Sequence, residues 1–223
     1  MLSVIVPVLN EEIGITNFLL PLQDYRQPNL ELILVDGGSR DKTIELAEPL
    51  CDRIFASQKG RAQQMNVGAN QAKGNILLFL HADTQLPNQF NHIIEQSMAE
   101  SHNVWGRFDV RLSGQNTALR MVEFFMNHRS RWTGIATGDQ AVFVKADVFN
   151  QIEGYQNISL MEDIALSKAL KSISPPVCLK SKVISSSRRW ETFGLWRTIF
   201  LMWRLRLAYF LGADPNRLAA KYE

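Results

Sequence analysis

The feature that most constrains the fold of this chain is the alternation of short apolar segments with helical segments in its first hundred residues. Apolar strands are predicted over 2–7, 30–35, 53–56 and 76–80. Between them, helices are predicted over about 10–20, 41–50 and 59–72, and Lys73-Gly74 is expected to form a C-terminal glycine cap. Alternation of this kind predicts an α/β protein with a parallel, doubly wound sheet.

The second half of the chain is less regular. Helices are predicted over about 88–101, 116–128, 146–151, 161–171 and 192–211. Strands are predicted over 104–112, 141–144, 177–179 and 182–187. No linker breaks the chain, and 223 residues suffice for one well-cored domain but are few for two, so we expect one domain over 1–223.

Polar residues follow three of the predicted strands. Asn10 and Glu11 come after the first strand, Asp36 after the second, and His81 and Asp83 after the fourth. Because parallel strands point the same way, these side chains are expected to share one rim of the sheet, where α/β proteins bind ligands. A carboxylate at that position is well placed to hold a divalent cation against a phosphate.

Each of these residues also has an ordinary structural explanation. Asp36, followed by two glycines, is typical of an Asx turn, although the same glycines allow a ligand to approach the backbone closely. Glu11 has a favourable charge for the first turn of a helix. Because all of these polar residues are expected at the same rim of the sheet, a nucleotide-binding site explains them better than three separate structural roles do.

Charge and cysteine content restrict the setting of the protein. The chain carries a formal charge of +2, but residues 188–223 hold seven basic and three acidic residues, which leaves 17 basic and 19 acidic residues in the body. A slightly acidic body argues against nucleic-acid binding. Cys51 and Cys178 lack metal-site spacing, and the N-terminus has no signal-peptide pattern, so a reduced, cytoplasmic setting is expected.

Several motifs occur in the order found in family-2 glycosyltransferases, and the chain resembles a small single-domain bacterial subgroup of that family. The motifs are Val4-Ile-Val-Pro-Val-Leu-Asn-Glu-Glu12, Val35-Asp-Gly-Gly-Ser-Arg-Asp-Lys-Thr43, Gly60-Arg-Ala-Gln-Gln-Met-Asn-Val-Gly-Ala69, Leu80-His-Ala-Asp-Thr84, Gly138-Asp-Gln140, Met161-Glu-Asp163 and Ser187-Arg-Arg-Trp190. The resemblance covers about residues 2–190. It implies the GT-A fold, a Rossmann-like doubly wound mixed sheet, here followed by an amphipathic, aromatic C-terminal helix.

The resemblance also implies roles for individual residues. Residues 1–100 would form the nucleotide-sugar-binding half, 101–190 the acceptor-side half and 191–223 a helical tail. The donor nucleotide, from a UDP- or GDP-sugar, would be bound by Pro7, Asn10, Glu11, Asp36, Arg61, Asn66, His81 and Ala82. The diphosphate and the acceptor would be contacted by Asp139, Gln140, Arg188, Arg189 and Trp190.

Three carboxylates complete the implied site. Asp163, with Glu162 beside it, matches the catalytic base that takes a proton from the acceptor hydroxyl in an inverting single displacement. Asp83 matches the last carboxylate of the D-x-D motif, which implies Mn²⁺ or Mg²⁺ as cofactor.

Two departures from the family pattern affect this interpretation. His81 replaces the first carboxylate of D-x-D, where it can hydrogen-bond the ribose or serve as a neutral metal ligand. The Q-x-x-R-W motif of polymer synthases is matched by Ser186-Ser-Arg-Arg-Trp190, without the glutamine. With no set of multiple membrane spans either, we expect one sugar to be transferred per turnover.

The segment 192–211 bears on the acceptor. It is rich in aromatic residues, and about 20 helical residues reach roughly 30 Å, but three arginines argue against a membrane span. Arg197 and Arg204 share one face, whereas Arg206 points about 160–180° away from them. The pattern leaves two interpretations open. The first is peripheral contact with the inner face of the cell membrane, which would suit a lipid-linked or polyisoprenoid acceptor, and the second is burial in the core or a homodimer.

Two other function classes remain open on the residues alone. A nucleotidyltransferase also needs a nucleotide pocket and a carboxylate-held metal, but typically has a basic, glycine-rich loop where this chain has Asn10-Glu-Glu. A non-catalytic nucleotide-sugar-binding protein would keep the pocket and tolerate loss of Asp163.

Overall fold

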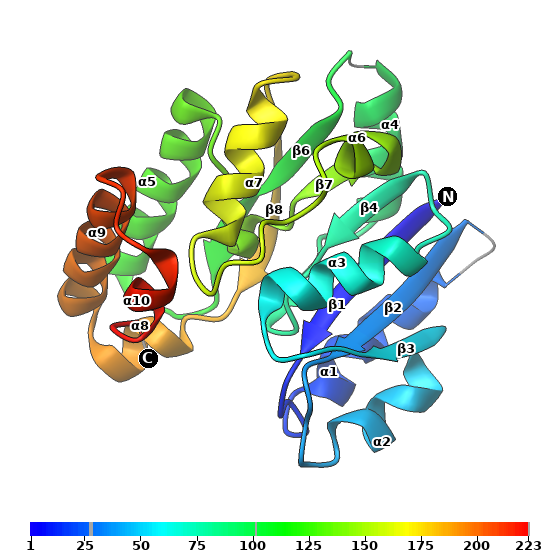
Figure 1. Ribbon diagram of the computed structural model, residues 1–223. Helices are drawn as coiled ribbons and strands as arrows, with labels where there is room; N and C mark the ends of the chain where they lie inside the picture. Colours follow the sequence, from blue (N-terminus) through cyan, green and yellow to red (C-terminus); the bar gives the residue numbers. More distant parts are fainter. Residues whose placement is uncertain (27–28, 101, 223) are drawn as a thin grey trace.

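The computed structural model of the protein describes residues 1–26, 29–100 and 102–222 (Figure 1). Its centre is an eight-stranded sheet with the order β3-β2-β1-β4-β7-β6-β8-β5. The strands are β1 (Leu2–Val8), β2 (Leu30–Asp36), β3 (Arg53–Ala56), β4 (Ile76–Phe79), β5 (Thr84–Gln85), β6 (Trp105–Leu112), β7 (Phe143–Lys145) and β8 (Val177–Ser185).

Helices surround this sheet. The α-helices are α1 (Ile15–Leu19), α2 (Thr43–Ala47), α3 (Arg61–Gln71), α4 (Phe90–Glu100), α5 (Thr117–Thr133), α6 (Ala146–Gln151), α7 (Glu162–Lys171), α8 (Arg188–Phe193), α9 (Leu195–Phe210) and α10 (Pro215–Ala219). Short 3-10 helices are η1 (Leu20–Tyr25), η2 (Glu48–Leu50) and η3 (Gly138–Gln140). Within the described ranges, none of these helices has both the length and the apolarity needed to cross a membrane.

Four of the five strands in the first hundred residues, β1 to β4, run parallel, as the strand–helix alternation predicts. β1 pairs with β2 along its whole length and with β4 on its other side, while β3 extends the sheet beyond β2. Val8 lies opposite Asp36 in this register, so the polar loops that follow β1 and β2 begin at the same edge.

The second half adds strands of both directions and makes the sheet mixed. β7 runs antiparallel to β4 and β6, β8 runs parallel to β6, and β5 closes the edge antiparallel to β8. Where two strands were predicted over 177–179 and 182–187, there is one strand whose pairing with β6 shifts between Phe108 and Asp109. The doubly wound, mixed α/β fold is confirmed.

Alternate residues of β1 bury against opposite layers, as the two-residue period of a strand requires. Val4 and Val6 pack in one core with Leu19 of α1, and this core also includes residues of α4. Ile5 packs in the other core with Met65 of α3, together with residues of α6 and α7. Helices therefore cover both faces of the sheet, and its carboxyl edge is left for ligands.

Two departures from the predicted helices have a local reason. α3 ends at Ala72 in extended backbone, and Gly74 does not adopt the left-handed conformation of a cap. Gly74 is instead required by close packing, because a Cβ there would lie 2.5 Å from Oγ of Ser3. The predicted helix 192–211 is divided at Gly194, whose φ of +82° favours glycine and separates α8 from α9.

Candidate active site

The carboxyl ends of β1 and β2 are held together by Gln64, a buried residue of α3. Its side-chain amide donates hydrogen bonds to the carbonyl oxygens of Val8 (2.9 Å) and Val35 (2.8 Å). Glycine at 37 fits this arrangement, since a Cβ there would lie 3.0 Å from Oε1 of Gln64. The rim that the parallel strands create is therefore fixed by an internal hydrogen-bonded bridge.

Asp36 and Asn10 shape the loop that follows β2. The Asp36 carboxylate accepts hydrogen bonds from the N–H of Gly38 (3.1 Å) and from the N–H (3.0 Å) and hydroxyl (2.6 Å) of Ser39. Oδ1 of Asn10 accepts a hydrogen bond from the N–H of Arg40 (2.9 Å). The Asx turn favoured by the glycines is thus present, and both polar side chains form the wall of the rim.

A pocket of about 400 Å³ opens beside the ends of β1 and β4. Glu11, Ala82 and Asp83 line it, together with Arg188 at the start of α8. Burial raises the pKa of Glu11, an effect that Arg188 opposes and the charge of Asp83 reinforces. Two carboxylates and a guanidinium on one wall suit a phosphate group and a divalent cation. Pro7, by contrast, is buried within β1.

His81 stands just beyond β4 with its ring against the backbone of Gly138. A Cβ at position 138 would collide with the imidazole, so this close approach requires glycine. Burial, together with the positive charge of Arg61, lowers the pKa of His81 to about 3. Nδ1 of His81 lies 3.9 Å from Oδ1 of Asp139. The ring is neutral at physiological pH and can act as a hydrogen-bonding group or a metal ligand.

Asp163 and Glu162 form the first turn of α7. The N–H of Gly138 donates a hydrogen bond to Oδ2 of Asp163 (3.1 Å), and the N–H of Ile164 donates to Oδ1 (2.7 Å). Met161, just before them, has a φ of +70°, a conformation that is costly for a side chain of this size and typical of functional sites. The turn at Gly138 and the start of α7 are therefore fixed to each other.

The carboxyl groups of this cluster bind protons more tightly than free carboxyl groups. Burial, with a contribution from the charge of Asp163, raises the pKa of Glu162 to about 7. Burial also raises the pKa of Asp163, against two backbone hydrogen bonds that act to lower it. Burial and the charge of Asp83 raise the pKa of Asp139 to about 6. A carboxylate whose pKa approaches neutrality is an effective general base.

Two arginines bring positive charge to these carboxylates. Burial acts to lower the pKa of Arg61, on α3, but the charges of Glu162 and Asp139 outweigh it and raise that pKa. Burial lowers the pKa of Arg129, on α5, although Asp163 lies near enough to oppose the effect. Within the described part of the chain, Nε and Nη2 of Arg129 are buried without hydrogen-bond partners. An unpaired guanidinium in such a place is suited to an anion.

Two residues that the resemblance assigned to the site hold neighbouring loops instead. Nδ2 of Asn66 donates to the carbonyl of Tyr155 (2.8 Å), and the N–H of Tyr155 donates to Oδ1 of Asn66 (2.9 Å). Gln140 is 0% exposed, and its amide donates to Oγ of Ser130 (3.1 Å) and accepts from the N–H of Thr137 (3.3 Å). The side chain of Gln140 thus points into the protein and not toward an acceptor.

Among the described residues that line the pocket beside Arg188, neither Arg189 nor Trp190 is found. Nη2 of Arg189 donates to the carbonyl oxygen of Tyr222 (2.5 Å), and its guanidinium stacks 3.6 Å from the centre of the Tyr222 ring. Trp190 packs against apolar side chains of α5. Tyr222, like Arg129, reaches the site through tertiary packing, and no local motif identifies either residue.

The surroundings of Asp83 determine whether the pocket can hold Mn²⁺ or Mg²⁺. No three His, Cys, Asp or Glu side chains in the described ranges lie close enough to form a metal cluster. Nucleotide enzymes, however, hold such ions by one or two carboxylates together with substrate phosphates and water. Asp83 is exposed at the pocket and raises the pKa of both Glu11 and Asp139, so negative charge accumulates there. These residues fit an ion shared with a diphosphate.

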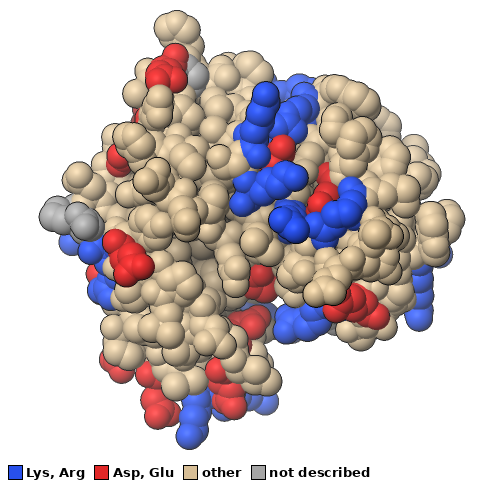
Figure 2. All heavy atoms as spheres, turned by 180° about the vertical axis from the view of Figure 1, so that it is seen from behind, with Lys and Arg blue, Asp and Glu red and all other residues tan. Residues whose placement is uncertain are grey.

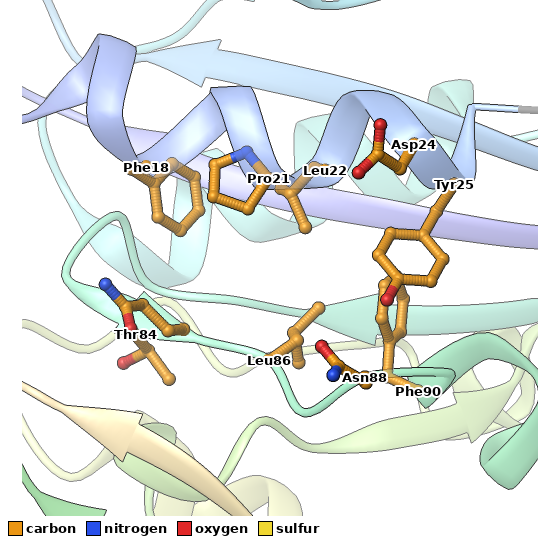
Figure 3. Close-up of a pocket in the computed structure, with 10 residues that line it drawn as sticks. Phe18, Pro21, Leu22, Asp24, Tyr25, Thr84, Leu86, Asn88 and Phe90 are labelled. Atoms are coloured by element: carbon orange, nitrogen blue, oxygen red, sulfur yellow. The ribbon is translucent and has the colours of Figure 1, made fainter.

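A second pocket, of about 290 Å³, lies between η1 and the segment after β4 (Figure 3). Its walls are apolar and polar in similar measure, and the ring of Tyr25 meets that of Phe90 edge-on at 4.9 Å. Phe18 and Gln85 line both pockets. Among the described residues, no arginine or lysine lines the second pocket, so the pocket of Asp83 and Arg188 is the better phosphate site.

The fold and this site place carboxylates and arginines at the carboxyl edge of an α/β sheet, where proteins of this class bind their ligands. Residues 3–153 match the model of glycosyl transferase family 2, and the chain belongs to that family. The family membership that the motif resemblance implies is therefore confirmed.

Known proteins agree with this assignment. An undecaprenyl-phosphate 4-deoxy-4-formamido-L-arabinose transferase of Pseudomonas aeruginosa (strain LESB58) is 26% identical over 159 residues, which are 66% of this chain and 46% of that protein. The chain spans about half the length of the curated relatives it matches.

Solved structures share the fold. TarS 1–349 of S. aureus in complex with UDP superposes with a TM-score of 0.67 at 20% identity, covering 83% of this chain and 60% of that one. A mannosyltransferase of Pyrobaculum calidifontis in complex with GDP-Man and Mn²⁺ superposes with a TM-score of 0.65 at 19% identity, covering 93% of this chain and 60% of that one.

Proposed function

We propose that the protein transfers one sugar per turnover from a UDP- or GDP-sugar to an acceptor hydroxyl, with inversion at the anomeric carbon. The observation that carries this proposal is the carboxylate of Asp163, fixed by the Gly138 N–H and given a raised pKa by burial, in the same cluster as Asp83 and Asp139. The solved complexes with UDP and with GDP-Man support these two donor classes.

In this proposal residues 1–100 bind the donor and residues 101–190 face the acceptor, with 191–223 as a helical tail. The loop shaped by Asn10 and Asp36 meets the base and ribose, and the neutral ring of His81 offers a hydrogen bond without competing positive charge. Arg61 and Arg188 attract the diphosphate, since guanidinium groups match phosphate oxygens in geometry and charge.

The chemical step uses the two carboxyl groups at the start of α7 in different ways. The acceptor oxygen attacks the anomeric carbon while its proton passes to the carboxylate of Asp163, and the bond from that carbon to the diphosphate oxygen breaks. With a pKa of about 7, Glu162 retains a proton for part of the time at neutral pH, which limits charge repulsion beside the base. Arg129 stabilises the ionised form of Asp163.

We propose that Asp83 holds Mn²⁺ or Mg²⁺ together with the donor phosphates. When bound, the ion neutralises charge on the leaving diphosphate. The complex of the Pyrobaculum calidifontis mannosyltransferase with Mn²⁺ supports this assignment.

For the acceptor, we propose a polyisoprenoid or another lipid-linked molecule at the inner face of the cell membrane. The name of the undecaprenyl-phosphate sugar transferase, a relative at 26% identity, supports this class. Residues 192–211 would then contact either the membrane or a second copy of the chain.

The test is an assay of nucleoside diphosphate release from UDP-GlcNAc and GDP-mannose with Mn²⁺, in the presence and absence of polyisoprenyl phosphate. Release that depends on Asp163, with a product of inverted anomeric configuration, supports the proposal. Release of pyrophosphate from a nucleoside triphosphate would indicate nucleotidyl transfer instead.

A further inference from the structure

The exposed aromatic side chains gather on the C-terminal helices and on α5. In the described part of the chain, all eight exposed aromatic residues lie on α5, α8 and α9, and three exposed aliphatic residues lie among them or directly after α9. We call this set the aromatic surface: Met121, Phe124, Phe125, Trp132, Phe193, Trp196, Phe200, Trp203, Leu207, Phe210 and Leu211. Large exposed apolar patches are uncommon on soluble proteins and mark interaction sites.

The spacing along α9 produces one continuous outward stripe. Trp196, Phe200, Trp203, Leu207 and Phe210 follow one another at intervals of four and three residues, so they share a face. Their exposure is high, 68% for Trp203 and 78% for Phe210, whereas Leu205 on the opposite face is buried. The outward stripe is therefore not part of the core of this chain.

The arginines of α9 flank this stripe on both sides. On a helical wheel, Arg197 and Arg204 lie about 80–100° to one side of the stripe, and Arg206 lies about as far to the other. The three arginines do not share one face in the sequence pattern because they lie on the two sides of the apolar stripe. α9 contains no acidic residue.

α5 extends the surface next to α9. The two helices lie side by side (Figure 1), and Ile199 of α9 packs in one cluster with Val122 of α5. Along the outer face of α5, the ring of Phe124 lies 3.8 Å from that of His128, which lies 5.9 Å from Trp132. The apolar stripes of both helices therefore form one surface.

We propose that the aromatic surface binds the surface of an anionic lipid bilayer. Tryptophan and phenylalanine side chains at the headgroup level bury apolar area in the bilayer surface, and the arginines beside them are attracted to anionic lipid headgroups. Both contributions strengthen binding to a membrane surface. Residues 188–223 carry seven basic and three acidic residues, and Glu123 on α5 is buried and paired with Arg120 at 3.0 Å. Seen from behind, the molecule shows a group of Lys and Arg side chains between its centre and its right side, with a few Asp and Glu side chains among them (Figure 2).

The same charges disfavour a second copy as the occupant. A two-fold dimer would place the same patch on both sides of the interface. The α9 arginines of one copy would then lie in the same interface as those of the other, with no carboxylate on α9 to pair with them. Anionic headgroups supply the missing negative charge.

Docking in this way would bring the active site to the bilayer. The inner side of α9 packs directly on the start of α7, where Leu205 contacts the cluster of Met161 and Ile164. Asp163 therefore lies roughly one helix diameter, about 10 Å, behind the docked face. The link to a lipid-linked acceptor rests on the proposed function, whereas the docking itself does not.

The test is flotation of the full chain with vesicles of phosphatidylcholine, with or without phosphatidylglycerol, in the absence of any donor. The first variant combines Phe200→Ser, Trp203→Ser and Leu207→Ser and removes apolar side chains of the aromatic surface. The second variant combines Arg197→Gln and Arg204→Gln. The control, Leu20→Ser, removes an exposed apolar residue elsewhere. We expect binding to vesicles that contain phosphatidylglycerol and its loss in the first variant. The second variant should bind about 25-fold more weakly, about fivefold for each arginine. Leu20→Ser should bind like the wild type.

Failure of the wild type to bind either vesicle, or equal binding by the first variant, overturns the proposal. A wild-type dimer in light scattering that the first variant converts to a monomer would assign the surface to a second copy. Thermal unfolding of each variant checks folding, and donor binding measured without vesicles separates failure of docking from failure of the proposed function.

Discussion

The backbone N–H of Gly138 donates a hydrogen bond to Oδ2 of Asp163 at 3.1 Å, and the ring of His81 packs against the same glycine. One turn thereby connects the rim after β4 with the first turn of α7. His81 and Asp163 are positioned by a contact that leaves no space for a side chain at 138.

Replacing this glycine should disturb both partners. In Gly138→Ala the new Cβ meets the His81 ring, so either the ring or the turn must move and the bond to Asp163 lengthens. We expect at least a tenfold loss of kcat, because small displacements of a catalytic group are costly. Steady-state assays measure the activity and thermal unfolding the stability. Gly14→Ala, where a Cβ would meet nothing within 4 Å, is the control for stability. Unchanged kcat in a folded Gly138→Ala protein would contradict this role.

Asp163→Asn tests the base directly. Asparagine keeps the size of the side chain and an oxygen that can accept the Gly138 hydrogen bond, but it cannot take the acceptor proton. We expect kcat to fall by about 10²–10⁴ while the donor dissociation constant changes little. Single-turnover kinetics and calorimetric donor binding separate the two effects. Retained turnover would remove Asp163 from the chemistry and favour a role in binding.

Arg129 should control the pH dependence of the same group. Its positive charge lowers the pKa of Asp163, so its removal raises that pKa and a higher pH is needed to ionise the base. In Arg129→Met the acid limb of the kcat/KM profile should therefore move to higher pH. Arg129→Lys, which keeps the charge, should leave the limb close to that of the wild type. The same limb in all three proteins would show that Arg129 does not act on the base.

Ionised Glu162 should lower the free energy of unfolding of the protein. Its pKa rises from 4.5 to about 7 on folding, so the folded state binds the proton more tightly than the unfolded state. The stability that this proton provides is fully present below about pH 4.5 and is lost as the pH rises through about 7. Glu162→Gln, neutral throughout, should be more stable than the wild type by on the order of 2 kcal/mol near pH 8 and equal near pH 4.

Denaturant unfolding at the two pH values measures this difference. The matched control is Glu48→Gln, at an exposed site outside the cluster. A loss of stability in Glu162→Gln near pH 8 would mean that the ionised carboxylate is compensated by Arg61.

The parallel strands and the polar residues at their carboxyl edge could be predicted from the sequence, because they depend on local sequence pattern. Buried parallel strands have continuous apolar runs, and their common direction places Asn10, Asp36 and Asp83 at one edge without knowledge of the packing. Arg129 could not be predicted, because its position near Asp163 depends on how α5 packs against the rest of the molecule. The helix break at Gly194 does not follow from the sequence pattern, because aromatic residues continue on both sides of it.

Calorimetric titration of UDP- and GDP-sugars, with and without Mn²⁺, into the wild type and Asp83→Ala tests the central claim most directly. We predict that one nucleotide class binds in a metal-dependent manner and that Asp83→Ala loses this dependence. At 100 times the dissociation constant, that donor should also stabilise the wild type by about 2.7 kcal/mol. Binding of neither class to the folded wild type, or the same metal-dependent affinity in Asp83→Ala, would contradict the assignment of the donor site to this rim.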